Sequence, residues 1–548
     1  MTLCNEVWTI FSSILPTHPA LSSSLGTMSR DYPSDILLQI FSHLDSQSKQ
    51  RLCLVSRYFH SIFAPLVLRH IRFLFCQERA STESIDARLK TCSSSLSNLY
   101  QHARTLRVKT NSFYLSRHVT TSLLPALWRT MASLASLKSL ELEWERHGEE
   151  NLEMMERYQS HVIESVLHAT KDRLDRLVLI PDAASQSLPV GLEWIRGLKS
   201  LRIVHDQLGW GCSGFFWYDS EDDRACQCHR QWMKNALKPL ISANPELETL
   251  EIVQGCRNGG PEPNDVLPAS LKGLRNLTIS GLELPSNQKR RASLVELSPL
   301  RNLRHLTVRA PYKWLKIDAF WGALKAAQPP LETLASFQVC LSMVNYLNSF
   351  SGLRSLEIQR IDAVDECHSP EILSLFLDHA LPSHAYSLER LEIHYQSDVS
   401  TLSGWDFDPN TWAPALAQLS KLKHLAIYPP PHSAHHEPIT TSQLFRSYQA
   451  LLDNVGDMSS LITLKINHPQ PTFECGTGHM HWSSGVQRAL NNVVPKLRVK
   501  NASPRELVLY TGVQHCVPLG SEGWGYNPVR VCVPEVDSSD EDDDIYRA

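Results

Sequence analysis

Long hydrophobic runs are absent from the sequence, since none approaches the roughly 20 residues that a membrane-spanning helix requires. Glycine is scarce, with 23 residues in 548, and the sequence contains no glycine-rich phosphate loop, no G-x-S-x-G nucleophile motif and no H-E-x-x-H zinc motif. The 53 basic residues do not outnumber the 57 acidic ones, and the formal net charge is −4. These absences predict a chain without a catalytic site, a cofactor, a membrane segment or a general affinity for nucleic acid.

The 13 cysteines are scattered without a paired spacing. This distribution is typical of reduced thiols and predicts a cytoplasmic and/or nuclear protein. Neither group of nearby cysteines and histidines has the Cys-x2-Cys pairs usual for structural zinc, so we predict no metal site. An enzyme with zinc near Cys226 stays an open alternative, which bound stoichiometric zinc would reveal. The two groups are Cys212, Cys226, Cys228 and His229, and Cys475, His479 and His481.

A short leucine pattern, L-x-x-L-x-[LIV], recurs through most of the chain. The alternating end of each copy predicts a short strand with one apolar face. Segments such as 319–327 and 371–379 predict helices between the copies. A single strand and helix cannot bury their apolar faces alone, so neighbouring copies must stack into an α/β solenoid with a parallel sheet. The copies start at residues 103, 137, 174, 198, 247, 274, 303, 331, 353, 388, 422 and 461, with a weaker copy at 507–509.

This repeat resembles leucine-rich repeats, although the Asn or Cys expected after each strand is mostly missing. Side chains that alternate with the core leucines are expected on the outer face of the sheet. The longest interruption, 205–245, holds Trp210 and Trp217, and two further loop insertions are expected at 429–438 and 468–485. Ordinary solvated positions are the alternative interpretation of these outward residues. The candidate substrate-binding residues are Arg202, Trp210, Trp217, Glu251, Thr307, Glu357 and Glu392.

The segment 28–75 has a helical pattern that differs from the repeats. Apolar residues fall at helical spacing after Pro33, which suits a first helical turn, and a second apolar stripe ends before Pro65. The ordered set resembles an F-box, with Tyr32, Asp35 and Phe59 standing where that family has Leu, Glu and Trp. The residues that carry the resemblance are Pro33, Asp35, Ile36, Leu37, Ile40, Phe41 and Leu44, then Leu52, Val55, Ser56, Arg57 and Phe59.

The resemblance implies a small three-helix F-box that docks on a Skp-family adaptor and, through it, on a cullin. It implies a non-catalytic substrate-recognition subunit of an SCF-type ubiquitin ligase, whose repeats bind an unknown protein substrate. A non-degradative interaction scaffold is the alternative, and a simple helical cap on the solenoid is the structural alternative for 28–75. The expected adaptor-binding residues are Pro33, Ile36, Leu37, Ile40, Phe41, Leu44, Val55 and Phe59.

The two ends of the chain look different from its middle. Residues 1–27 predict a flexible leader, and 534–548, with seven acids and one base, predict a disordered acidic tail. Acids follow Ser538 and Ser539 at the third position, which makes both serines candidates for phosphorylation. The predicted organisation is therefore a leader at 1–27, an F-box at 28–75, a leucine-rich-repeat-like solenoid at 95–515 and a tail at 534–548.

Overall fold

A computed structural model describes the chain in two units. The N-terminal unit comprises 1–261 and 265–271, and the C-terminal unit comprises 262–264 and 272–548. The structure describes residues 34–44, 48–49, 52–53, 57–75, 102–111, 134, 136–145, 167, 170, 172–180, 192–205, 235, 237–254, 268, 271–280, 298–309, 318–336, 339–358, 370–393, 409–427, 441–467, 492–498, 506–510, 514–518 and 526–529.

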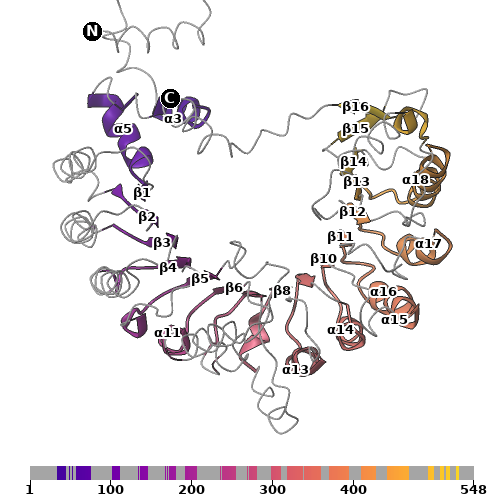
Figure 1. Cartoon of the computed structure of the whole chain (residues 1–548), viewed down its shortest axis with the longest axis horizontal. Coiled ribbons are helices and arrows are strands. Elements are labelled where there is room, and N and C mark those ends of the chain that lie inside the picture. Colours follow the sequence, from indigo (N-terminus) through magenta and orange to yellow (C-terminus); the bar gives the residue numbers. More distant parts are fainter. Residues whose placement is uncertain are drawn as a thin grey trace, which may run out of the picture. The chain divides into compact units, whose positions relative to one another are not determined.

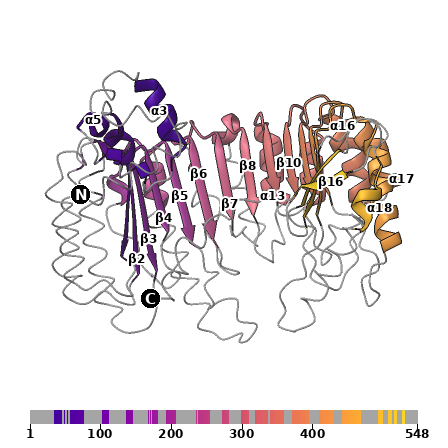
Figure 2. The same cartoon turned by 90° about the horizontal axis from the view of Figure 1, so that it is seen from above.

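The N-terminal unit begins with helices and continues as a parallel sheet (Figure 1). Its described strands pair in chain order, each parallel to the next, from β1 to β6. Figure 2 shows these strands side by side as arrows that point the same way. The elements are α3 (Ser34–Ser42), α5 (Arg57–Val67), β1 (His70–Phe75), β2 (Thr105–Asn111), β3 (Ser139–Glu145), β4 (Arg176–Ile180), η3 (Leu192–Trp194), β5 (Ser200–His205), α11 (Lys238–Ser242) and β6 (Thr249–Gln254).

The C-terminal unit repeats the strand-and-helix pattern more regularly. Strands β7 to β14 pair in parallel in chain order, and α13, α14, α15, α17 and α18 follow one another along one side of them (Figure 1). The elements are β7 (Asn276–Ser280), η6 (Ser298–Asn302), β8 (His305–Arg309), α13 (Asp318–Ala327), β9 (Thr333–Ser336), α14 (Leu341–Leu347), β10 (Ser355–Ile358), α15 (Pro370–Leu375), η8 (Phe376–Ala380), α16 (Leu381–Ser383), β11 (Arg390–Ile393), α17 (Pro409–Ala417), β12 (His424–Ile427), α18 (Thr441–Val455), β13 (Thr463–Asn467), η9 (Val494–Lys496) and β14 (Glu506–Tyr510).

The predicted α/β repeat architecture is confirmed in both units, and so are the helices predicted at 319–327 and 371–379. One part of the sheet differs from the prediction. After β14 the chain turns back through two antiparallel strands, β15 (Gln514–Pro518) and β16 (Tyr526–Val529). These strands carry no copy of the leucine pattern, so the repeat could not reveal them.

The repeat leucines form the core because the register of the strands stacks them directly on one another. The second leucine of each copy pairs with its equivalent on the next strand, and each of these leucines is at most 1% exposed. Burying one leucine side chain stabilises a fold by about 1.5–3 kcal/mol. The stacked leucines are Leu106, Leu140, Leu177, Leu201 and Leu250 in the N-terminal unit and Leu277, Leu306, Leu334, Leu356, Leu391, Leu425, Leu464 and Leu507 in the C-terminal unit.

A buried polar side chain in each unit ties neighbouring copies together. In the N-terminal unit, Asn244 accepts the backbone N–H of Leu198 at 2.9 Å and donates to the carbonyls of Ile195 and Leu240 at 2.9 and 2.8 Å. In the C-terminal unit, Nδ1 of His384 accepts the backbone N–H of Leu353 at 3.4 Å. Leucine-rich repeats carry an Asn or Cys after the strand, where this sequence mostly lacks one, whereas Asn244 and His384 lie ahead of the next strand.

Candidate protein-binding site

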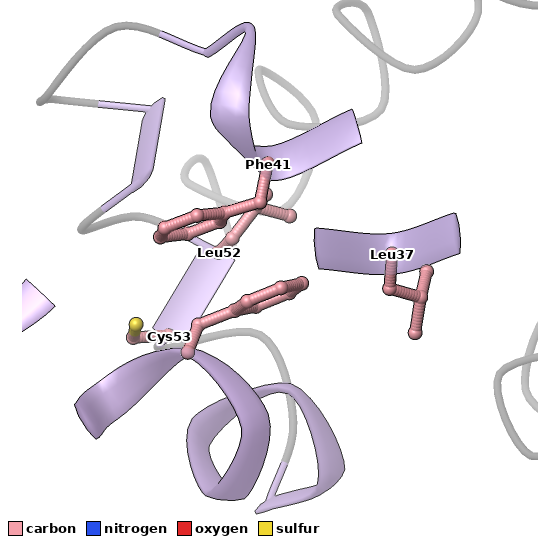
Figure 3. Packing of buried hydrophobic residues seen from close by; sticks show 5 residues of the cluster. Leu37, Phe41, Leu52 and Cys53 are labelled. Atoms are coloured by element: carbon pink, nitrogen blue, oxygen red, sulfur yellow. The ribbon is translucent and has the colours of Figure 1, made fainter. Parts of the chain in front are cut away.

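The helices α3 and α5 hold a small apolar core of their own (Figure 3). The rings of Phe41 and Phe63 stack with centroids 4.2 Å apart and planes inclined by 7°, and Phe59 lies 5.7 Å from Phe63. Burial raises the pKa of the Cys53 thiol in this core, which makes it a poor nucleophile. The apolar spacing of the sequence therefore produces a packed helical cluster of Leu37, Phe41, Leu52, Cys53 and Phe63, with Leu44, Tyr58, Phe59, Ile62 and Val67 against it.

Two of the predicted adaptor-binding residues lie inside this cluster. Leu37 is 8% exposed and Phe41 is 5% exposed, so in this conformation they hold α3 against α5. Leu44 and Phe59 pack partly buried against the same cluster. The binding role predicted for these four residues stays a prediction.

The structure describes the other four predicted adaptor-binding residues only in part or not at all. Ile36 and Ile40 belong to α3, but their side chains lie outside the described part of the structure. Pro33 and Val55 lie outside the described residues altogether.

The structure adds two exposed leucines that the sequence reading did not select. Leu38 on α3 is 37% exposed and Leu66 on α5 is 40% exposed. Each follows directly after a residue that the pattern did mark, namely Leu37 and Pro65. Leu38 lies one step from the buried Leu37, or about 100° around α3, and this offset is the signal that could have identified it. Leu66 follows Ile62 at helical spacing, so the sequence pattern alone does not distinguish it from a core residue.

The helices join the repeat array through a short connection. Leu68 and Arg69 are the only residues between α5 and β1. The carbonyl of Arg69 accepts the backbone N–H groups of Arg104 and Thr105 at 3.0 and 2.9 Å, and β1 then pairs with β2 along its whole length. Hydrogen bonds to β2 therefore hold the chain from Arg69 onward, two residues after α5 ends.

The outward strand faces of the N-terminal unit carry paired charges. Nε of the predicted substrate-binding residue Arg202 lies 3.1 Å from Oε2 of Glu251, also predicted, on the next strand. Arg107 similarly bridges Glu141 at 3.0 Å and Glu143 at 2.8 Å. These side chains are partly exposed, and such pairs contribute about 0–1 kcal/mol to stability. The two predicted residues thus neutralise each other, with enough exposure to reach a ligand.

The outward faces of the C-terminal unit carry threonines on β7 and β8 and glutamates on β10 and β11. Thr307 lies beside Thr278 on adjacent strands. Glu357 and Glu392 also face each other across adjacent strands, and Glu392, only 9% exposed, forms an ion pair with Arg390. The remaining predicted residues, Trp210 and Trp217, lie outside the described residues, as do Ser538 and Ser539.

The described part of the chain holds neither a cluster of metal ligands nor a membrane-spanning helix. No three His, Cys, Asp or Glu side chains there gather as metal ligands would. The two groups around Cys226 and Cys475 lie outside the described residues. Within that same part, none of the helices has both the length and the apolar character to span a membrane.

Comparison with known proteins characterises the helical segment. Residues 31–73 match the F-box-like family model. The match contains α3 and α5 and ends within β1. None of the curated proteins compared with the sequence matches it.

Among solved structures, the chain is similar to one in the crystal structure of the TLR13–ssRNA13 complex. The identity is 14% and the TM-score is 0.29. The similarity covers 81% of this chain and 62% of that one, so the chain spans about three fifths of the length of this structural neighbour.

Proposed function

We propose that this protein is a substrate-recognition subunit of an SCF-type ubiquitin ligase and is itself non-catalytic. The observation that carries the proposal is the F-box-like match at 31–73, which coincides with a separately packed helical pair. F-box domains generally bind Skp-type adaptors, and such an adaptor would join the chain to a cullin. The second part of the proposal is that the repeat units hold a protein substrate close to the ubiquitin-conjugating machinery, which raises its effective concentration there.

The adaptor-binding surface is proposed to combine predicted and newly found residues. Leu38 and Leu66 present apolar surface on α3 and α5, and burying such side chains at an interface is favourable. Pro33, Ile36, Ile40 and Val55 stay in the proposed surface on the strength of the family resemblance. Leu37, Phe41, Leu44 and Phe59 are proposed to support this surface by fixing the angle between the helices.

The short connection from α5 to β1 supports a role in positioning. Because Arg69 is hydrogen-bonded to the start of β2, the anchored part of the chain begins two residues after α5 ends. A bound adaptor would therefore stand close to the N-terminal strands. Substrate contacts are proposed on the outward strand faces, where Arg202, Glu251, Thr307, Glu357 and Glu392 lie.

The test is an affinity pull-down of the full chain with bound proteins identified by mass spectrometry. The variant Leu38→Glu/Leu66→Glu places charge on the exposed apolar positions and leaves the helical core intact. We expect the wild-type chain to retain a Skp-family adaptor and a cullin, and the variant to lose both. A matched control, Gln39→Glu/Ser61→Glu, adds the same charge at exposed polar positions of the same helices and should retain them.

Two results would oppose the proposal in different ways. If neither the wild type nor the control retains an adaptor, the helical pair is only a cap on the repeat array. If an adaptor is retained without a cullin, the chain acts as a non-degradative scaffold.

A further inference from the structure

A row of charged side chains runs along the amino-terminal edge of the strands in each unit. Arg69 follows Leu68 just before β1, and every other member is the residue that follows the first apolar position of a repeat copy. Its backbone N–H donates to the carbonyl of the preceding member at 2.8–3.0 Å, so consecutive side chains emerge from adjacent strands. In chain order the rows are Arg69, Arg104, Lys138, Asp175, Lys199 and Glu248 in the N-terminal unit, and Arg275, Arg304, Glu332, Arg354, Glu389 and Lys423 in the C-terminal unit.

In the C-terminal unit most of the row alternates in sign. Nη1 of Arg304 lies 2.6 Å from Oε1 of Glu332, and Nζ of Lys423 lies 2.6 Å from Oε2 of Glu389. The hydrogen bond and charge of Lys423, with a further contribution from Arg354, lower the pKa of the Glu389 carboxyl. The alternation therefore lets each acid be flanked by cations on both neighbouring strands.

The row in the N-terminal unit starts differently, with three cations in succession. Lys138 has Asp175 on its far side, at 3.8 Å, with both side chains about half exposed. Arg69 and Arg104 are exposed and have no acidic partner among the residues that the structure describes. Adjacent strands lie about 4.8 Å apart, and like charges directly opposite each other are unfavourable. An anion placed along the three side chains would remove this repulsion.

We propose that Arg69, Arg104 and Lys138, the basic stripe, form a docking site for an acidic segment of a partner protein. An extended run of Asp and Glu can lie across the three strands and pair with each cation in turn. A protein segment is favoured over nucleic acid because the row continues with Asp175 after only three cations and the whole chain has a formal net charge of −4, whereas nucleic-acid sites present a longer basic surface. Arg69 follows α5 by two residues, so the partner would bind beside the F-box-like helices. The proposal does not depend on adaptor binding by those helices.

The experiment measures binding of a fluorescent oligo-glutamate peptide to the full chain by anisotropy. We expect binding that weakens as ionic strength rises, because the contacts are exposed. Arg104→Glu/Lys138→Glu should weaken binding by about tenfold or more. The control Lys423→Gln removes a cation that already has an acidic partner in the other row and should leave binding unchanged.

A thermal melt separates loss of binding from loss of folding. The single variant Arg104→Glu places an acid between Arg69 and Lys138, which is the order that Arg304, Glu332 and Arg354 have naturally. It should unfold at the same or a higher temperature while binding the acidic peptide less tightly. Unchanged peptide binding in the double variant would overturn the proposal. Tighter binding of an oligo-uridylate that is lost in the same variant would also overturn it, because the partner would then be a nucleic acid.

Discussion

Asn244 in the N-terminal unit and His384 in the C-terminal unit meet the same need with different chemistry. Both are buried ahead of a repeat copy, and both accept the N–H of the leucine that begins the preceding copy. Asn244 makes three hydrogen bonds of 2.8–2.9 Å and carries no charge at any pH. His384 accepts one longer bond, packs its ring 4.9 Å from that of Phe350, and can be protonated. In other copies a backbone carbonyl accepts the equivalent N–H, as that of Leu300 does for Leu303. At the two copies where a side chain takes this role, the residue type decides whether pH affects the bond.

The largest expected effect is that of Asn244→Ala. The substitution leaves the buried N–H of Leu198 and the carbonyl of Leu240 without the partner that Asn244 supplies, and each unsatisfied group costs about 1–3 kcal/mol. The carbonyl of Ile195 keeps only a 3.4 Å bond from Nη1 of Arg196. We expect the N-terminal unit to lose about 4 kcal/mol of unfolding free energy, allowing for some relaxation. Urea unfolding followed by hydrogen exchange in β5 and β6 would measure this loss. A loss of less than about 1 kcal/mol would show that the acceptor is dispensable.

The next effect is a loss of stability at acidic pH, which we expect at His384 and not at Asn244. Burial lowers the pKa of His384 from 6.5 to about 4. Below pH 6.5 the unfolded chain takes up a proton that the folded chain refuses, so stability falls as pH drops from about 6.5 to about 4. The full pKa shift corresponds to a loss of about 3 kcal/mol of unfolding free energy.

The measurement is urea unfolding at pH 7 and at pH 4.5, read from hydrogen exchange in β10 and β11. His384→Asn should remove most of the difference between the two pH values and remain folded at pH 7. If the variant keeps the whole pH dependence, another group is responsible and the comparison fails.

The smallest effect concerns a second asparagine, Asn302, which makes a similar hydrogen bond at the surface. Nδ2 of Asn302 donates to the carbonyl of Lys272 at 2.8 Å, but the residue is exposed. Water can replace this bond, so Asn302→Ala should cost about 0.5 kcal/mol in chemical denaturation. A loss as large as that of Asn244→Ala would show that burial is not what separates the two asparagines.

The sequence predicted the repeat array because its signal is strong and regular. Residues such as Leu356 and Ile358 recur at the same spacing in nearly every copy, and only one fold buries all of them. The hairpin of β15 and β16 lacks that spacing and was missed. Asn244 was missed because an isolated asparagine carries no periodicity. The repeat family has its Asn or Cys after the strand, whereas Asn244 lies before one.

The helical segment shows a different limit of sequence reading. The spacing of Leu37, Phe41 and Leu44 revealed a helix with an apolar stripe. A stripe of this kind does not tell whether it faces another helix of the same chain or a partner. The structure assigns Leu37 and Phe41 to the internal core and leaves Leu38 and Leu66 at the surface.

Binding of a Skp-family adaptor to α3 and α5 is the central claim, and hydrogen–deuterium exchange tests it most directly. The full chain would be compared with and without a purified Skp-family adaptor. We predict slower exchange in α3 and α5, with little change in β7 to β14. No protection in α3 and α5, or protection confined to the repeat strands, would contradict the claim.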